Sequence, residues 1–417
     1  MRKCLLVTGG VLAVLLAVFV GRFLMVARPF HLSSLQYSPS SVLDQCVLLS
    51  SAEDTTGSGV PVDVIGAEDI VPIGDGLAIA SSNDNMFQWV NPRGSPSTTP
   101  PGHLFLLDTR GATPKLSVLP LKGFPDRIPF HPHGIYYDPK RERLFVVNHA
   151  YREGGERVEL FTVQQSSADQ YQARYLRTVR SKAFDAFAMG NLNDVISPFE
   201  NELYVTVYRA FPDPLEGRQA ASPLVSALLD PLAFIMGSAT FVYQCRFEER
   251  AGATEFATCA VVADHLGMAN GIAHSADRSE LFVSDMPNWR LARYLRDSDT
   301  GRLSRNGHVS LPHAVDNLEL DRESGAFYGG SVPSFLRHIA FTDSDGAEFS
   351  PGGSLRIELL PDGSARTHDL IMQDGSLISG VSCGPKIGKY VVLGSWAAPG
   401  ILVCPFSESD AIPLNSE

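Results

Sequence analysis

The chain has 417 residues, of which 44% are hydrophobic, so it can bury a large core as two ordinary domains or as one large all-β domain. Its 34 Lys and Arg residues against 46 Asp and Glu residues give a net charge of −12. Because a phosphate backbone attracts basic surfaces, this balance argues against nucleic acid as a partner.

The first thirty residues predict a membrane anchor. Residues 4–20 form one apolar run and residues 23–27 a second, and roughly twenty apolar residues suffice to cross a bilayer. Arg2 and Lys3 precede the run, and no clean small-residue cleavage site follows it. This pattern favours an uncleaved signal-anchor over a removed signal peptide. The alternative is a buried core helix at the N-terminus.

The rest of the chain then divides into a linker and a folded body. We expect residues 1–30 to be the anchor, 31–45 the linker and 46–417 the body, with an insertion at 211–243. Basic residues lie on both sides of the apolar run, so the positive-inside rule sets the orientation only weakly. We expect the body in the secretory-pathway lumen or outside the cell, and the six cysteines fit an oxidising compartment.

The cysteine positions suggest two disulfides. Cys46 and Cys404 lie near the two ends of the body, so a bridge between them would close almost all of it. Cys245 and Cys259 flank a hairpin-like segment and can also pair, which leaves Cys383 as a small buried residue. Connectivity does not follow from sequence alone, and free buried thiols are the alternative for either pair.

One strand pattern returns along the body. Long amphipathic helical patterns are scarce there, whereas short β-branched and aromatic runs bounded by turn residues recur. A polar pair, an alternating strand, a polar turn and a second strand begin six times, at Glu68, His133, Asn193, Asn270, Asp316 and Ser379. Repeats of four short strands around a channel are typical of a β-propeller. We predict an all-β, six-bladed propeller that carries an N-terminal hydrophobic anchor helix.

Ring closure needs the last strand to pair with the first. The segment "GILVCPF" near the C-terminus would pair with a strand next to Cys46, which gives the Cys46–Cys404 bridge a mechanical purpose. Residues 211–243 interrupt the repeat, and their apolar content predicts a helical insertion over one face. It is either a packing element or an element that acts as a lid or touches a membrane.

A propeller brings the six polar pairs together around its axis. They are Glu68 with Asp69, His133 with Gly134, Asn193 with Asp194, Asn270 with Gly271, Asp316 with Asn317, and Ser379 with Gly380. No Lys or Arg stands at these positions, so the buried carboxylates need a cation. Oxygen donors without cysteine suit Ca²⁺ rather than Zn²⁺. An Asx-turn explains any single pair, but pairs in register favour a metal site.

Two histidines stand at the ends of one repeat. His133 belongs to the predicted ring, and His149 ends the strand that returns toward it. A neutral imidazole beside another can act as a general base on water, with the second imidazole orienting the first. A lone histidine at a strand end is more often structural, so the residues themselves leave both readings open.

These motifs resemble the paraoxonase/arylesterase family of calcium-dependent lactonases. The resemblance rests on "AEDI", "HPHGI", "FVVNH", "NLNDV", "MANGIAHSADRSELFVSDM" and "VDNLELDRESG", and it covers nearly the whole chain from Cys46 to Cys404. It implies a six-bladed propeller with two central calcium ions and a retained N-terminal anchor.

The resemblance also assigns residues. It implies a catalytic calcium held by Glu68, Asn193, Asn270, Asp316 and Asn317, and a structural calcium held by Asp69, Asp194 and the backbone carbonyl of Ile135. His133 and His149 match the family's proposed catalytic dyad, and Cys46 and Cys404 match its closing cysteines.

The chain departs from the family pattern at two places. Val207, Tyr208 and Arg209 stand where the family has an Asn-Asp-His segment, and Val332 stands where the family has a histidine. These changes bear on substrate range and on the proton relay more than on the metal.

The sequence thus predicts a membrane-anchored, calcium-dependent hydrolase of small-molecule lactones, with aryl esters as a second substrate class. One alternative is a non-catalytic, calcium-stabilised propeller that binds a partner through its loop face, which the missing polar segment at 207–209 favours. Another is a sugar-lactonase type of propeller enzyme.

Overall fold

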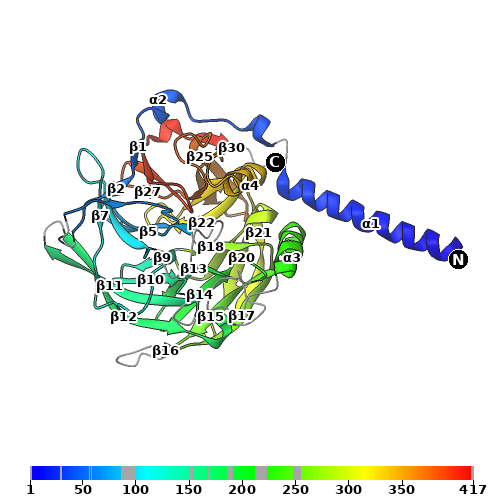
Figure 1. Ribbon diagram of the computed structural model, residues 1–417, viewed down its shortest axis with the longest axis horizontal. Coiled ribbons are helices and arrows are strands. Elements are labelled where there is room, and N and C mark those ends of the chain that lie inside the picture. Colours follow the sequence, from blue (N-terminus) through cyan, green and yellow to red (C-terminus); the bar gives the residue numbers. More distant parts are fainter. Residues whose placement is uncertain are drawn as a thin grey trace.

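The computed structural model describes residues 2–28, 31–55, 57, 59–85, 100–150, 155–167, 170–185, 191–211, 223–247 and 255–414. Six sheets are arranged as the blades of a β-propeller, and a long helix projects from its side (Figure 1). This confirms the predicted fold class.

The first three blades follow chain order. Blade 1 is β4 (Ile70–Gly74), β5 (Leu77–Ser82), β6 (His103–Asp108) and β7 (Lys115–Val118). Blade 2 is β9 (Pro132–Asp138), β10 (Arg143–Asn148), β11 (Arg157–Ser167) and β12 (Gln170–Arg180), which β8 (Leu121–Lys122) and β16 (Glu255–Phe256) extend. Blade 3 is β13 (Leu192–Phe199), β14 (Glu202–Val207), β15 (Thr240–Arg246) and β17 (Thr258–Leu266).

The other three blades complete the ring. Blade 4 is β18 (Ala269–His274), β19 (Glu280–Asp285), β20 (Arg290–Arg296) and β21 (Leu303–Ser310). Blade 5 is β22 (Ala314–Leu320), β23 (Phe327–Val332), β24 (Gly352–Leu359), β25 (Ala365–Gln373) and β30 (Ile412–Leu414). Blade 6 is β26 (Val381–Cys383), β28 (Tyr390–Ser395), β29 (Ile401–Pro405) and β1 (Val47–Leu49), with β27 (Lys386–Ile387) beside β28. A separate ribbon pairs β2 (Ser51–Ala52) with β3 (Val62–Asp63).

Blade 6 closes the ring with strands from both ends of the body. Strand β1 pairs antiparallel with β29, with Val47 opposite Val403, as the sequence predicts. A disulfide joins Cys46 to Cys404 beside this pairing, and a second disulfide joins Cys245 to Cys259. Cys383 is buried and free. The closure leaves the first and last strands of the body in one sheet, which removes an exposed edge.

The core lies between neighbouring blades. Strand β5 is buried along its whole length, because its two faces pack against different sheets. One cluster, for example, joins Phe105 and Leu107 of blade 1 to Val392 and Ile401 of blade 6. Strands buried on both faces carry near-continuous apolar runs, which explains the sequence pattern.

The polar pairs sit where the innermost strands lose their regular register. The pairing of β13 shifts between Leu192 and Val195, that of β18 between Ala269 and Ile272, and that of β22 between Val315 and Leu318. Each interval holds one predicted pair. A β-bulge leaves residues outside the ladder and re-aims their side chains, which is how these strands present polar groups near the axis.

Glycine follows the first polar residue where blades approach closely. A Cβ added to Gly134 would lie 2.3 Å from the Asn193 carbonyl oxygen, and one added to Gly271 would lie 2.5 Å from the Leu318 nitrogen. The His-Gly and Asn-Gly pairs of the sequence therefore reflect contact between the inner strands of adjacent blades.

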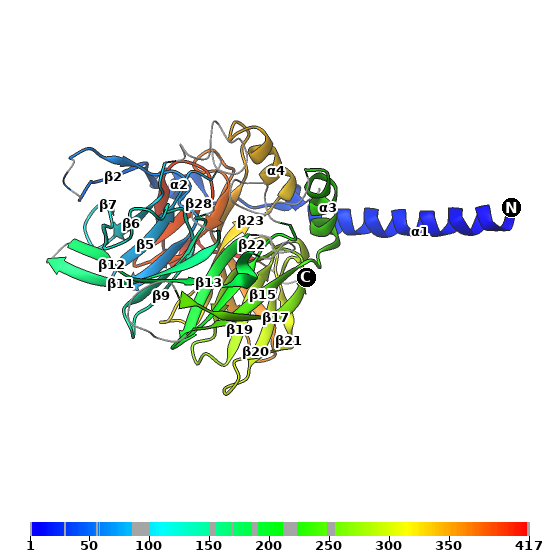
Figure 2. The same ribbon diagram turned by 60° about the horizontal axis from the view of Figure 1, so that its bottom comes forward.

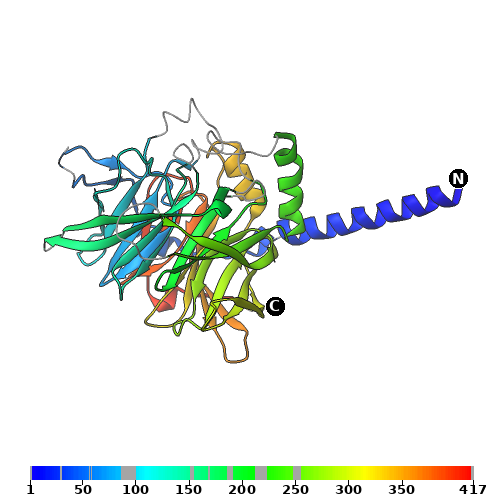
Figure 3. The same ribbon diagram turned by 90° about the horizontal axis from the view of Figure 1, so that it is seen from below.

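Three of the helices, α1, α3 and α4, gather on one side of the propeller. The α-helices are α1 (Arg2–Ala27), α2 (Ser40–Leu43), α3 (Pro223–Met236) and α4 (Phe335–Asp343). The short 3₁₀ helices are η1 (His31–Ser34), η5 (Lys182–Asp185), η6 (Met286–Asn288) and η7 (Glu408–Asp410). Helices α3 and α4 lie next to the base of α1 (Figures 2 and 3). Helix α3 belongs to the predicted insertion, of which residues 212–222 lie outside the described residues.

Helix α1 includes most of the segment predicted as the anchor, residues 1–30. Among the described residues, it is the helix with enough length and apolar composition to cross a membrane. The segment predicted as a linker, residues 31–45, contains η1 and α2.

Candidate functional site

Five predicted calcium ligands meet at one end of the axis, and all are buried. Their exposed fractions are 6% or less, and they are Glu68, Asn193, Asn270, Asp316 and Asn317. Four of them, all but Asn317, line the floor of a cavity of about 640 Å³ together with His133. Asn317 joins the set by donating its amide to Glu68 Oε1 at 2.8 Å.

Each of the five keeps one side-chain oxygen that accepts no hydrogen bond among the described residues. These atoms are Glu68 Oε2, Asn193 Oδ1, Asn270 Oδ1, Asp316 Oδ1 and Asn317 Oδ1. Buried polar atoms are almost always paired, and an unpaired one costs about 1–3 kcal/mol. Five such oxygens among neighbouring residues therefore form a donor set that suits an electropositive ligand.

The amide nitrogens show why these oxygens stay free. Asn193 Nδ2 lies 3.1 Å from His133 Nε2, Asn270 Nδ2 donates to the Met286 sulfur at 3.2 Å, and Asn317 Nδ2 donates to Glu68. Every amide is thus held by its nitrogen, so its oxygen is turned away from those partners.

The carboxylates at the axis are costly to ionise. Burial, followed by repulsion from Asp69 and Asp316, raises the pKa of Glu68 well above its usual range. Burial raises the pKa of Asp316 to about 8 and that of Asp69 to about 7, and it raises that of Asp194 well above normal. A cation would offset both causes.

The donor set fits a hard cation. Within the described ranges, no group of three or more His, Cys, Asp or Glu side chains is placed to hold a metal ion. The five residues instead offer carboxylate and amide oxygens, which are the ligands that Ca²⁺ takes. The residues present therefore fit the predicted ion.

Asp69 and Asp194 occupy a different environment. The carboxylate of Asp69 accepts the backbone N–H groups of Ile70 and Ile135, both at 2.8 Å. That of Asp194 accepts those of Val195 at 2.7 Å and Ile272 at 2.8 Å. Each aspartate therefore ties its own blade to the next blade.

These two aspartates thus have a structural role with or without metal. Ile135 lies beside Asp69 through its N–H, and the ligand role of its carbonyl stays a prediction.

The two predicted catalytic histidines lie in contact. Their ring centroids are 4.9 Å apart and the rings are edge-on, and both side chains are buried. His133 Nε2 is 3.5 Å from Glu68 Oε1. Burial, followed by the neighbouring His149, lowers the pKa of His133 well below its usual range, so the imidazole is neutral at pH 7.

Sequence reasoning missed a third member of this group. Glu156 Oε2 lies 2.7 Å from Nδ1 of His149, and the exposed fraction of Glu156 is 1%. The Nδ1–H group of His149 donates to this carboxylate, which fixes the orientation of the ring. Glu156 stands in the turn between β10 and β11, outside the repeat, and only its closeness in sequence to His149 could have signalled it.

The family model for Arylesterase matches residues 63–218 and 256–402, which is most of the body. The chain belongs to the arylesterase family. It is 25% identical over 337 residues to human serum paraoxonase/lactonase 3, covering 79% of this chain and 83% of that protein. It is 24% identical over 404 residues to the rabbit (Oryctolagus cuniculus) serum paraoxonase/lactonase 3, covering 95% and 97%. Among solved structures, it resembles a gluconolactonase from Xanthomonas campestris at 15% identity and a TM-score of 0.45, over 87% and 95% of the two chains.

Two of the four residues at which the sequence predicts a departure from the family pattern lie at the cavity. Tyr208 and Arg209 line the cavity, and the Tyr208 ring stacks on His133 with centroids 6.4 Å apart. Val332 is buried in an apolar cluster with Trp289. Ser379 does not join the polar ring, because its hydroxyl bonds the backbone of Ser350 and Gly375.

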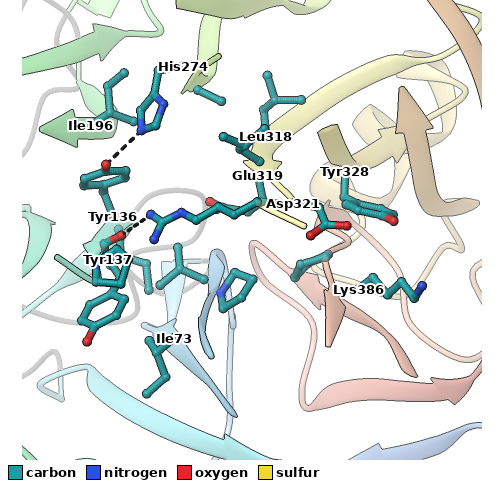
Figure 4. A pocket seen from close by; sticks show the side chains of 18 of the residues that line it. Ile73, Tyr136, Tyr137, Ile196, His274, Leu318, Glu319, Asp321, Tyr328 and Lys386 are labelled. Carbon is teal, nitrogen blue, oxygen red and sulfur yellow. Dashed lines mark hydrogen bonds between the residues drawn. The ribbon is translucent and has the colours of Figure 1, made fainter. Parts of the chain in front are cut away.

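A second, smaller cavity of about 340 Å³ lies toward the other ends of the same inner strands (Figure 4). The Tyr136 hydroxyl meets His274 Nε2 there at 3.0 Å. Burial raises the pKa of Tyr136 to about 12 and lowers that of His274 to about 4. Glu319 also lines this cavity, and burial raises its pKa well above normal. The two cavities thus flank the axial polar groups.

Proposed function

We propose that the protein is a calcium-dependent hydrolase of lactones and aryl esters, held at a membrane by α1. The observation that carries this proposal is a set of five buried side-chain oxygens without a hydrogen-bond donor among the described residues, of which four belong to residues that line a cavity together with His133. Membership of the arylesterase family supports hydrolysis, and the relatives bear the names paraoxonase/lactonase and paraoxonase/arylesterase.

The residues at the axis would hold two ions. Glu68, Asn193, Asn270, Asp316 and Asn317 would hold the first, and Asp69, Asp194 and the Ile135 carbonyl the second. When bound, calcium supplies positive charge that offsets the buried carboxylates and stabilises negative charge that develops on a substrate carbonyl oxygen.

The histidines would activate water. The His133 ring is neutral because burial lowers its pKa, so it can take up a proton. Uptake at Nε2 requires that the Asn193 amide stop donating to that atom, and Glu68 Oε1, 3.5 Å away, can then accept the new N–H. His149, held in one tautomer by Glu156, orients the His133 ring from its edge.

The apolar helices support attachment to a membrane. Helices α3 and α4, which lie at the base of α1, also carry exposed apolar side chains. These side chains are Leu228, Leu229, Leu232, Met236, Leu336 and Ile339. The two disulfides support a body in the secretory-pathway lumen or outside the cell, where oxidation is maintained.

A panel of lactones and aryl esters, assayed with calcium and with a chelator, tests this function. We expect turnover that chelation abolishes and that added calcium restores. Turnover that persists in the chelator would contradict the calcium requirement. Calcium binding without turnover of any ester or lactone would instead support the non-catalytic alternative.

A further inference from the structure

The last turns of α1 reach the cavity above the proposed site. Phe23, Val26 and Ala27 line the same 640 Å³ cavity whose floor contains Glu68 and His133. Val26 and Ala27 are buried, whereas Phe23 is 40% exposed. A helix that only tethered the body to a membrane would not need to enter the cavity.

Arg22 fixes α1 against its neighbours. Its guanidinium donates to the carbonyls of Ile235 and Met236, both at 3.2 Å, and to Asn288 Oδ1 at 2.9 Å. The two carbonyls belong to the last turn of α3, where a cation is favourable. Asn288 belongs to η6, next to the Met286 that holds the Asn270 amide.

A second set of contacts holds the end of α1. Trp289 donates its indole N–H to the Val26 carbonyl at 3.0 Å, and the Arg28 guanidinium lies 4.0 Å from the Trp289 ring centre. Val26 packs in a buried cluster with Met286, Trp289 and Phe335. The end of α1 is therefore part of the folded body and keeps a fixed position relative to the site.

The cavity has a polar floor and an apolar wall. The floor contains the side chains that would hold calcium, whereas α1, α3 and α4 contribute apolar wall residues such as Phe23, Phe234, Phe335 and Ile339. Its volume is in the range of small-molecule sites. A carbonyl group at the floor would leave the rest of a substrate against the three helices.

We propose that the end of α1 is a wall of the substrate pocket and that Phe23 selects substrates by the length of their apolar substituent. This inference rests on the proposed function. Phe23 is the wall residue of α1 with the largest side chain, and its partial exposure leaves ring surface for a ligand to cover.

Phe19 provides a matched control on the same helix. It precedes Phe23 by one turn, is 38% exposed, and does not line the cavity. Both rings would lie near a membrane surface, so a change that acts only through membrane attachment would affect both variants alike.

The test uses the full-length protein in detergent and lactones that differ only in alkyl substituent, methyl against decyl. We expect Phe23→Ala to lower kcat/KM for the decyl lactone about tenfold and to leave that for the methyl lactone within twofold. Phe19→Ala should leave both values within twofold. Equal decyl-to-methyl ratios in wild type and Phe23→Ala, or equal shifts in both variants, would overturn the proposal.

Binding separates this inference from the proposed function. Cyclic ketones with the same substituents undergo no hydrolysis, and their affinity can be measured by titration calorimetry. If the wild type hydrolyses no lactone, the proposed function is wrong. A pocket wall formed by α1 would even then bind the decyl ketone with a Kd about tenfold weaker in Phe23→Ala than in Phe19→Ala. Equal Kd values in the two variants would contradict the proposal that Phe23 is part of the pocket wall.

Discussion

The three asparagines of the site show how single residues could prepare the proposed metal centre. Each amide nitrogen has a fixed partner, and each amide oxygen lacks a donor among the described residues. An ordinary buried asparagine satisfies both ends, as Asn148 does: its oxygen accepts the His131 N–H at 2.8 Å, and its nitrogen donates to Glu159 at 3.0 Å. The difference points to a ligand role.

Asn270→Ala and Asn148→Ala should therefore differ in their response to calcium. Asn270→Ala removes a proposed ligand, so most of the calcium-dependent rise in melting temperature should be lost. Asn148→Ala should lower stability but keep that rise, because its oxygen is already paired. Thermal melts of both variants with and without calcium test this. Equal calcium-dependent shifts in the two variants would contradict it.

His133→Gln should fold normally and keep its calcium. It removes the imidazole that would take a proton from water, so kcat for lactones should fall by about 10² to 10⁴. His149→Gln should have a milder effect if that residue only orients its partner. Steady-state kinetics with calcium titration check both. Lactone turnover that survives His133→Gln nearly intact would leave Glu68 as the better candidate for the base.

Glu156→Gln should lower kcat by about 10- to 100-fold with little change in calcium affinity, because an amide no longer fixes the His149 tautomer. Glu159→Gln is the matched control. Glu159 is also fully buried, and its carboxylate binds Asn148 and Thr178 rather than a histidine. That control should change stability and leave kcat within a factor of about two. The same kcat in both variants would remove Glu156 from the mechanism.

At the scale of elements, the innermost strands position the site residues at irregularities in their pairing. Blade 6 closes the ring by pairing β1 with β29. The Cys46–Cys404 disulfide spans 358 residues, whereas Cys245–Cys259 spans 14 within one pair of strands. The long-range bridge therefore restricts the unfolded chain far more than the local one does.

Removing Cys46–Cys404 by alanine substitution should lower the free energy of unfolding by roughly 5 kcal/mol, against about 3 kcal/mol for Cys245–Cys259 in the chain-entropy account. Urea denaturation of the two double variants gives the comparison. A smaller loss for the Cys46–Cys404 variant than for the local pair would contradict the role of this bridge in closure.

The sequence predicted much of the fold because each blade repeats one local signal, a polar pair before two apolar strands. It also predicted the closing strand. Glu156 escaped prediction because it stands in the turn after β10, outside the repeat that marks His149. The wall formed by α1 escaped because Arg22 and Trp289 act through contacts more than 200 residues apart in sequence. Acidic Asp69 and Asp194 suggested metal, but their bonds to backbone amides of the next blade had no sequence signal.

For the whole molecule, the buried side chains at the propeller axis affect both the stability of the fold and the proposed site. Burial raises the pKa values of Glu68, Asp69, Asp194 and Asp316, and the charge of Asp69 raises those of the other three further. No ion pair joins a described Lys or Arg side chain to these carboxylates. A cation at the axis would offset this cost, so we expect the stability of the propeller to depend on the proposed ion.

The melting temperature of the purified full-length protein, measured in calcium and again in EDTA, tests this account most directly. A bound ligand stabilises the folded state by mass action, and the loss of tightly held ions should lower the melting temperature by about 10 °C or more. Calcium added back should restore it. A melting temperature that is the same in EDTA and in calcium would contradict a calcium centre at the axis.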